Sequence, residues 1–269
     1  MHPRVCLHQV GFLSEPTAAF VQFCREMGVQ HMTLAQPDAL DPSEIGELKA
    51  ALTAGGTFPT NMTQPFARHP DLERDTGGAG LALNQAIDAA AALGTRHIYI
   101  VSGGRGTLDW EAAAVRLAEL IAPCRAHAAG LGVTLSIETA NLLNADIHFA
   151  HTLDDTIRAA EIAGLDVTID LGACWFEGGL KEKFARAMPR TRLVQVSDYV
   201  PGDRSTPCRA VPGDGMVPLE RLLGDLLEAG YEGVFDLELL GPRIAAEGHR
   251  EAFARAAGNL SELLTKLGA

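Results

Sequence analysis

The segment RLVQVSD occupies residues 192–198 and decides how the rest of the chain is interpreted. It is a short apolar strand that carries a polar residue, Gln195, and ends in polar groups. Three other apolar segments end in a carboxylate: VTLSIE at Glu138, VTID at Asp170 and VFDLE at Glu238. Four strands that each bring an oxygen ligand near their C-terminal end predict one shared site.

Short apolar runs alternate with helical patterns on both sides of this segment. The expected strands cover residues 4–10, 31–34, 57–63, 97–101, 133–138, 167–170, 192–197 and 234–238. The expected helices cover residues 14–28, 42–52, 81–93, 110–129, 153–163, 180–188, 219–229 and 247–267. Pro59 weakens the third strand, and Pro123 is predicted to kink the fourth helix.

Strand–helix alternation of this kind indicates right-handed parallel crossover units. Eight such units in 269 residues predict an α/β fold, a (β/α)8 TIM barrel that forms a single domain over residues 1–269. An open doubly wound sheet is the alternative. It is disfavoured because VGFLSEP follows the first strand, where a dinucleotide-binding sheet would carry GxGxxG.

Active sites of such barrels lie at the C-terminal ends of the strands. Because side chains alternate along a strand, the residue two positions before each candidate ligand shares its face. If Glu138 points inward, Ser136 does too, and the polar residues of the other three strands also share one face. The inward set is Ser136, Glu138, Thr168, Asp170, Gln195, Asp236 and Glu238.

The four candidate ligands offer only hard oxygen donors. Such donors favour Mn²⁺ or Mg²⁺ over a zinc site built from thiolates, while Co²⁺ and an oxygen-bound Zn²⁺ remain open. Three clustered acids without a cation would repel one another and have strongly perturbed pKa values. The sequence therefore predicts one divalent cation bound by Glu138, Asp170, Gln195 and Glu238.

Composition and charge restrict the partners. The net charge is -12 and the pI is near 5.2, which argues against a nucleic acid partner. Five widely spaced cysteines without a CxxC pair fit a reducing compartment, and no apolar run is long enough to cross a bilayer. We expect a cytoplasmic protein that acts on a small molecule, with both a monomer and a homo-oligomer left open.

The motifs in their order resemble the xylose isomerase-like barrel superfamily, the sugar phosphate isomerases and epimerases, across essentially the whole chain. The matching segments are LHQVGF near the start, IETAN (137–141), IDLGACW (169–175), VQVSD (194–198), RAVPGDG (209–215) and GYEGVFDLEL (230–239). The resemblance implies that the Glu, Asp, His or Gln, and Glu of strands five to eight bind a divalent cation. By position these are Glu138, Asp170, Gln195 and Glu238.

Two positions depart from the pattern of that superfamily. The usual strand-seven histidine is Gln195 here, as in a subset that includes some dehydratases. A histidine that often follows the strand-six aspartate by three residues is Ala173 here. The resemblance thus implies the metal site but does not carry the detailed chemistry of the sugar epimerases.

The resulting hypothesis is a metal-dependent isomerase or epimerase of carbohydrate metabolism that acts on a hydroxy-ketone, sugar-like substrate. Glu138 or Glu238 would remove a proton next to a carbonyl polarised by the cation, and the enediolate would be reprotonated elsewhere. The alternatives are a lyase, a dehydratase of the 3-dehydroshikimate type, and a non-catalytic barrel that binds a sugar-like ligand.

Four further residues are candidates for substrate binding, each beside a structural alternative. His8 ends the first strand, where a hydrogen-bonded core histidine is the alternative. Trp175 would wall the pocket or pack on the surface. Asp198 would bind substrate, orient Gln195 or form a turn. Arg209 would bind an anion or hydroxyl of the substrate, and the alternative is a solvated loop residue.

Overall fold

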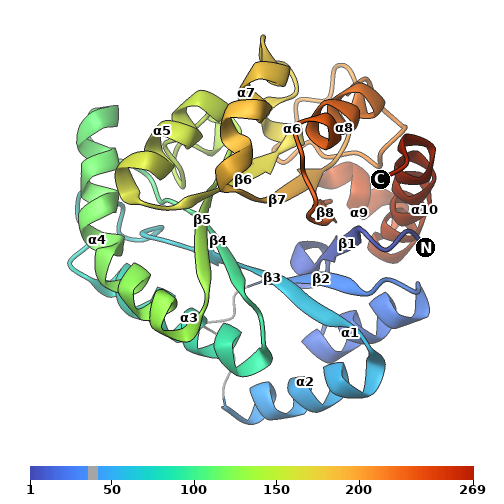
Figure 1. The fold of residues 1–269 in the computed structure, drawn as a ribbon, viewed down its shortest axis with the longest axis horizontal. Coiled ribbons are helices and arrows are strands. Elements are labelled where there is room, and N and C mark those ends of the chain that lie inside the picture. The colour runs from blue at the N-terminus through green and yellow to red at the C-terminus, as the bar shows by residue number, and fades with distance from the viewer. Residues whose placement is uncertain (36–41) are drawn as a thin grey trace.

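The computed structural model describes residues 1–35 and 42–269, and its eight parallel strands close into a barrel (Figure 1). Each strand pairs with its neighbours in chain order, and β1 pairs with β8. The predicted (β/α)8 barrel is therefore confirmed. The strands are β1 (Val5–His8), β2 (His31–Ala35), β3 (Phe58–Pro65), β4 (His97–Val101), β5 (Thr134–Glu138), β6 (Asp166–Asp170), β7 (Thr191–Val196) and β8 (Phe235–Leu237).

Helices surround the barrel between the strands (Figure 1). They are α1 (Thr17–Glu26), α2 (Pro42–Gly55), α3 (Gly78–Leu93), α4 (Trp110–Leu131), α5 (Leu153–Ala163), α6 (Leu171–Cys174), α7 (Leu180–Ala187), α8 (Leu219–Glu228), α9 (Pro242–Glu247) and α10 (His249–Leu267). Short 3₁₀ helices, among them η1 (Gln9–Phe12), lie in the connecting segments. Helix α5 illustrates the local signals, because the Thr152 side chain accepts from the Asp155 amide and Gly164 ends the helix at φ 64°.

The alternation of side chains along the strands is the predicted one. The apolar residues Ile137, Ile169 and Val194 are fully buried in the core that the helices cover. The inward polar residues bond to one another between nearby strands: Ser136 Oγ lies 2.7 Å from Thr168 Oγ1, and Thr33 Oγ1 donates to Asp236 Oδ2 at 2.8 Å. Burial of each large apolar side chain contributes about 1.5–3 kcal/mol to stability, so this pattern fixes the register.

Strand β3 is longer than the sequence predicts, and Pro59 lies within it. The register against β2 shifts at this point: Met32 pairs with Pro59, whereas Thr33 pairs with Asn61. The extra residue forms a bulge, where a proline costs no ladder hydrogen bond. The strand then continues to Pro65.

Helix boundaries also differ from the prediction: α2 ends at Gly55 and α3 begins at Gly78, each three residues outside the expected range, and three other expected helices differ as well. The first helix covers only Thr17–Glu26 of the expected residues 14–28. Helix α4 runs through Pro123 to Leu131. The closing helix is divided into α9 and α10 by Gly248, whose φ of 98° ends a helical turn.

Two further observations concern the chain as a whole. Its five cysteines are all free, as their spacing predicts. Among the helices of residues 1–35 and 42–269, none combines the length and the apolar character that crossing a membrane requires.

Candidate metal centre

Three carboxylates gather at the C-terminal end of the barrel. Glu138 is the last residue of β5, Asp170 is the last residue of β6, and Glu238 follows β8 directly. One carboxylate oxygen from each of the three residues lies within 4.8 Å of the other two. Glu138 is 6% exposed and Asp170 is 1% exposed, so the cluster is almost closed to solvent.

Burial and mutual repulsion perturb the acidity of this cluster. Burial, and then the charges of Glu238 and Asp170, raise the pKa of Glu138 well above its ordinary value. Burial also raises the pKa of Glu238, to about 8, although the nearby guanidinium of Arg209 opposes the rise. Without a compensating cation, the site therefore holds protons at neutral pH that ordinary glutamates would release.

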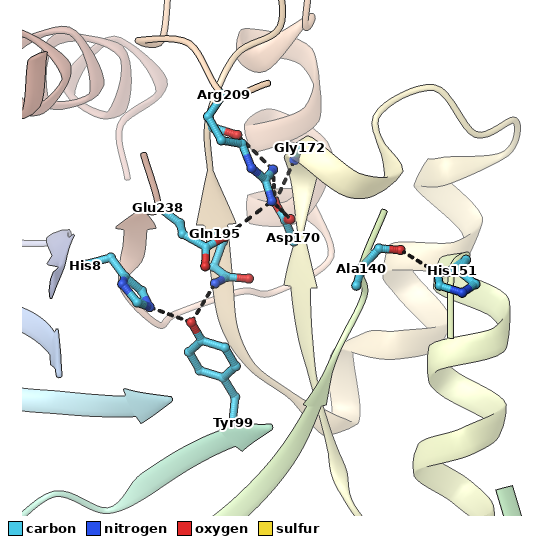
Figure 2. Close-up of polar contacts among 10 residues, drawn as sticks. His8, Tyr99, Ala140, His151, Asp170, Gly172, Gln195, Arg209 and Glu238 are labelled. Carbon is cyan, nitrogen blue, oxygen red and sulfur yellow. Dashed lines mark hydrogen bonds and ion pairs between the residues drawn. The ribbon is translucent and has the colours of Figure 1, made fainter. Parts of the chain in front are cut away.

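Gln195 lies beside this cluster, as the strand register requires. On β7 it pairs with Asp170 of β6, and its side chain is fully buried. Its Nε2 donates to the hydroxyl oxygen of Tyr99 at 3.1 Å, whereas its Oε1 has no hydrogen-bond partner among the described residues. Figure 2 shows the amide nitrogen turned toward Tyr99 and the oxygen turned away from it. A buried oxygen of this kind is ready to accept a ligand.

Arg209 reaches the cluster from the loop that follows β7. Its Nη1 donates to Asp170 Oδ1 at 3.0 Å and to Ser197 Oγ at 3.1 Å. Its Nη2 is paired with Asp170 Oδ2 and lies 3.3 Å from Glu238 Oε2 (Figure 2). Although burial lowers the pKa of Arg209, the carboxylates of Asp170 and Glu238 raise it above its ordinary value. Arg209 is therefore a partly desolvated cation held by two acids, not a solvated loop residue.

This set of donors fits a hard divalent cation. It combines three carboxylates with one amide oxygen that has no hydrogen-bond partner in the part of the chain that the structure describes. Oxygen donors of this type suit Mg²⁺, Mn²⁺ and related ions, and a bound cation would relieve the repulsion within the cluster. The residues that fit such an ion are Glu138, Asp170, Gln195 and Glu238.

Asp198 holds a loop and has little capacity left for a ligand. Its Oδ1 accepts from the backbone amides of Tyr199 and Val217, and its Oδ2 accepts from those of Gly213 and Gly215, all at 2.8–3.0 Å. Of the roles that the sequence leaves open for Asp198, the structure supports the turn. The aspartate fixes the loop that carries Arg209.

His8 is a buried, hydrogen-bonded histidine. Its Nδ1 accepts from the Val10 amide at 2.9 Å and its Nε2 lies 2.5 Å from the hydroxyl of Tyr99. Both ring nitrogens are thus occupied, which leaves His8 without a free polar atom for substrate. Burial lowers its pKa to about 3, so the ring is neutral.

Trp175 stacks on Tyr199, with ring centroids 5.9 Å apart. Tyr199, and not Trp175, lines a small cavity of about 30 Å³ beside Arg209, together with Asn141 and Asn144. A cavity of this size holds no more than one or two water molecules. Trp175 therefore packs against Tyr199 and does not itself line this cavity.

Several residues of the site escape prediction from the motifs alone. Tyr99 bonds both His8 and Gln195, and its inward position follows from the alternation in HIYIV. His148 Nε2 lies 2.7 Å from the carbonyl oxygen of Glu138 and fixes the end of β5. Gly172 leaves room for Arg209, because a Cβ there would collide with Nη1. These contacts join segments far apart in sequence.

The comparisons with known proteins agree with this architecture. The structure is similar to D-psicose 3-epimerase with D-tagatose from Clostridium cellulolyticum H10, at 15% identity and TM-score 0.81, with 98% of this chain and 99% of that chain covered. It is similar to the IOLI protein with a bound zinc atom, at 16% identity and TM-score 0.83, with 98% and 99% covered. It also resembles the probable 3-DHS dehydratase AsbF of Bacillus anthracis, involved in petrobactin synthesis, at 14% identity and TM-score 0.76, with 97% and 98% covered.

These solved structures share the fold with this chain at low sequence identity. No curated protein sequence is significantly similar to it. The model of the xylose isomerase-like TIM barrel family, however, matches residues 21–260, which is most of the chain. The chain belongs to the xylose isomerase-like TIM barrel family.

Proposed function

We propose that the chain is a divalent-metal-dependent isomerase or epimerase that acts on a hydroxy-ketone, sugar-like substrate. The observation that carries this proposal is the buried cluster of Glu138, Asp170 and Glu238, beside which the Gln195 oxygen has no partner among the described residues. The likeness to D-psicose 3-epimerase and to the zinc-bound IOLI protein supports it.

The four oxygen donors would hold one ion, with Mn²⁺ or Mg²⁺ the best match to hard ligands. When bound, the ion supplies Lewis acidity that polarises the substrate carbonyl and balances negative charge on its oxygen. Gln195 contributes a neutral donor at the position where a fourth carboxylate would make the site more anionic. Asp170 is fixed by Gly172, whose amide donates to Oδ1 at 2.8 Å.

Glu138 and Glu238 would move the proton. One glutamate accepts the proton from the carbon next to the carbonyl, the C–H electron pair forms a carbon–carbon double bond, and the carbonyl π pair moves onto the oxygen. The other glutamate, which takes up a proton from water before the substrate binds, returns it to the opposite face, which inverts the centre. Both side chains are largely buried, Glu238 being 13% exposed.

Arg209 and the neighbouring amides would contact the substrate oxygens. Arg209, Asn141 and Asn144 line the small cavity at the mouth and offer N–H donors to hydroxyl or carbonyl oxygens. Because this cavity is smaller than a sugar, substrate entry requires side chains at the mouth to move. The lining includes no lysine and only one arginine, which favours an uncharged, hydroxyl-rich substrate over a phosphorylated one.

A lyase is the second candidate, favoured by Gln195 at the strand-seven position and by the likeness to AsbF. In that reaction the same proton is removed, the carbon–oxygen bond at the next carbon breaks, and water leaves. Water loss in place of reprotonation distinguishes the two candidates.

The test is incubation of the Mn²⁺-loaded protein with hydroxy-ketone sugars and with 3-dehydroshikimate in D₂O. An isomerase or epimerase places one deuterium on the substrate carbon and releases no water, whereas a dehydratase yields a product that is lighter by one water molecule. Glu238→Gln is expected to abolish exchange while the fold is retained. Exchange at the wild-type rate in this variant would refute the proposed role of the glutamate, and no exchange with any substrate would favour a non-catalytic binder.

A further inference from the structure

A chain of three buried side chains connects β1, β4 and β7 directly beneath the carboxylates (Figure 2). His8 and Gln195 are 0% exposed and Tyr99 is 1% exposed. The Tyr99 hydroxyl lies 2.5 Å from His8 Nε2 and 3.1 Å from Gln195 Nε2. The last of the three side chains is Gln195, whose oxygen has no hydrogen-bond partner among the described residues. The contacts of Tyr99 therefore bear on how the Gln195 amide is oriented.

The backbone determines which nitrogen of His8 carries the proton. The amide of Val10 donates to His8 Nδ1 at 2.9 Å, so Nδ1 has a free lone pair and no hydrogen. A neutral imidazole that accepts at Nδ1 must carry its hydrogen on Nε2. His8 therefore donates to Tyr99, and the tyrosine oxygen is the acceptor.

The hydrogen of the Tyr99 hydroxyl is then directed elsewhere. Its oxygen already faces donors from His8 and Gln195. A hydroxyl group has a single hydrogen to give. Because donors from both sides face the oxygen, the hydroxyl hydrogen points away from His8 and from Gln195.

With its hydrogen directed away from Gln195, Tyr99 accepts from the Gln195 amide nitrogen at 3.1 Å. The amide must therefore turn its nitrogen to Tyr99 and leave its oxygen free. The opposite orientation would place the nitrogen near the carboxylates, where it would form hydrogen bonds and remove the oxygen ligand. The rotation of the Gln195 amide thus decides whether its oxygen is available to a metal ion.

We propose that Tyr99, oriented by His8, is a positioning residue that fixes the Gln195 amide with its oxygen available to the cation. This inference rests on the proposed metal site and adds a residue outside it. Partners of metal ligands commonly change metal affinity by 10–100-fold when they are removed. An amide needs such a partner because only one of its two ends, the oxygen, can bind a cation. A carboxylate ligand does not, because its two oxygens are equivalent.

The test is Mn²⁺ affinity, measured from the electron paramagnetic resonance signal of the free ion. Tyr99→Phe is expected to weaken binding about tenfold or more, because the amide loses its acceptor and rotates. Tyr231→Phe is the matched control: Tyr231 is also buried and its hydroxyl bonds to the backbone of Val194 and Val234, away from the Gln195 amide. Its Mn²⁺ affinity is expected to equal that of wild type.

A double-variant comparison separates positioning from a general structural effect. In a Gln195→Ala background, Tyr99→Phe is expected to leave Mn²⁺ affinity unchanged, because the group that Tyr99 orients is gone. An equal loss in both backgrounds would overturn the inference, since Tyr99 would then act through Glu238 or the fold. Unchanged affinity after Tyr99→Phe in the wild-type background would overturn it as well.

A measurement on the wild-type protein tests the inference without requiring any variant to fold. Nuclear Overhauser contacts between the Gln195 side-chain amide protons and the Tyr99 ring are expected both before and after Mg²⁺ is added. Their absence in either state would overturn the inference. If wild-type protein binds no Mn²⁺ at all, the proposed function fails; if it binds and only the Tyr99 effects are missing, the positioning role alone fails.

Discussion

Arg209 donates from two nitrogens to the two carboxylate oxygens of Asp170, so a cation of the chain itself faces the candidate metal ligands. The pair is largely buried, with side-chain exposures of 13% and 1%. Three ionised carboxylates and one guanidinium leave a charge that a single divalent cation balances. The three carboxylates alone carry one negative charge more than a divalent cation balances, and the positive charge of Arg209 offsets it.

Arg209→Met is expected to destabilise the metal-free protein by about 3–5 kcal/mol, because it leaves a buried carboxylate without its partner. Arg255→Met is the control, since Arg255 pairs with Asp214 and Glu247 at 39% exposure and should cost about 1 kcal/mol or less. Urea denaturation measures both. Equal losses in the two variants would contradict a special role for the buried pair.

Mn²⁺ affinity is expected to rise with pH up to about 8. In the metal-free protein the pKa of Glu238 is raised to about 8, mainly by burial, so the carboxyl is protonated below that pH. The ion must displace this proton, which weakens binding by about tenfold for each pH unit below 8. Titrations between pH 6 and 9 measure the slope. A flat profile would show that no proton is displaced at Glu238.

The stability of the metal-free protein is expected to fall as pH rises from about 4.5 to about 8. Glu238 has a raised pKa in the folded state, so the folded chain holds a proton that the unfolded chain, with an ordinary pKa of 4.5, releases over this interval. The free energy of unfolding then decreases by up to about 1.4 kcal/mol per pH unit from this group.

Glu238→Gln tests that assignment, because the amide keeps the shape and has no proton to lose. The variant should flatten the decline, so that above pH 8 the metal-free variant is more stable than metal-free wild type. Thermal unfolding followed by circular dichroism at pH 5, 6.5 and 8 gives the comparison. An unchanged slope would assign the dependence to other groups.

Gly172→Ala is expected to displace Arg209. A Cβ at this position would overlap Nη1 of Arg209 and Oγ of Ser197, so the side chain must leave the Asp170 carboxylate. We expect a loss of about 1–3 kcal/mol in stability, the usual cost of overpacking. Gly130→Ala on α4 has nothing within 4 Å of the added carbon and should be neutral or slightly stabilising. Similar effects at both positions would contradict the close approach at Gly172.

Much of the fold follows from local signals that the sequence contains. The Leu153–Ala163 helix and the His97–Val101 strand have their predicted bounds, because a threonine cap, a terminal glycine and β-branched residues act over a few positions. The inward set at the ends of β5 to β8 follows from alternation alone. Pro59 shows the limit, because a bulge that accommodates it depends on the neighbouring strand.

The contacts that complete the site depend on distance in space and not on local pattern. Arg209 is 39 residues from Asp170, and Tyr99 is 96 residues from Gln195. Asp198 illustrates the converse: its position after β7 leaves substrate binding, orientation of Gln195 and a turn open, and four backbone amides of its own loop occupy its carboxylate. A strand-end acid can therefore be predicted, but its partners decide its role.

The most direct test of the metal site is the stoichiometry of Mn²⁺ binding, measured by equilibrium dialysis for wild-type protein and for Asp170→Asn. Asp170 lies between Glu138 and Gln195 in strand order, and its replacement removes a charge without changing shape. One ion per chain in wild type, and a loss of tight binding in the folded variant, is the result predicted here. No bound ion in wild type, or undiminished binding in the variant, would contradict the account.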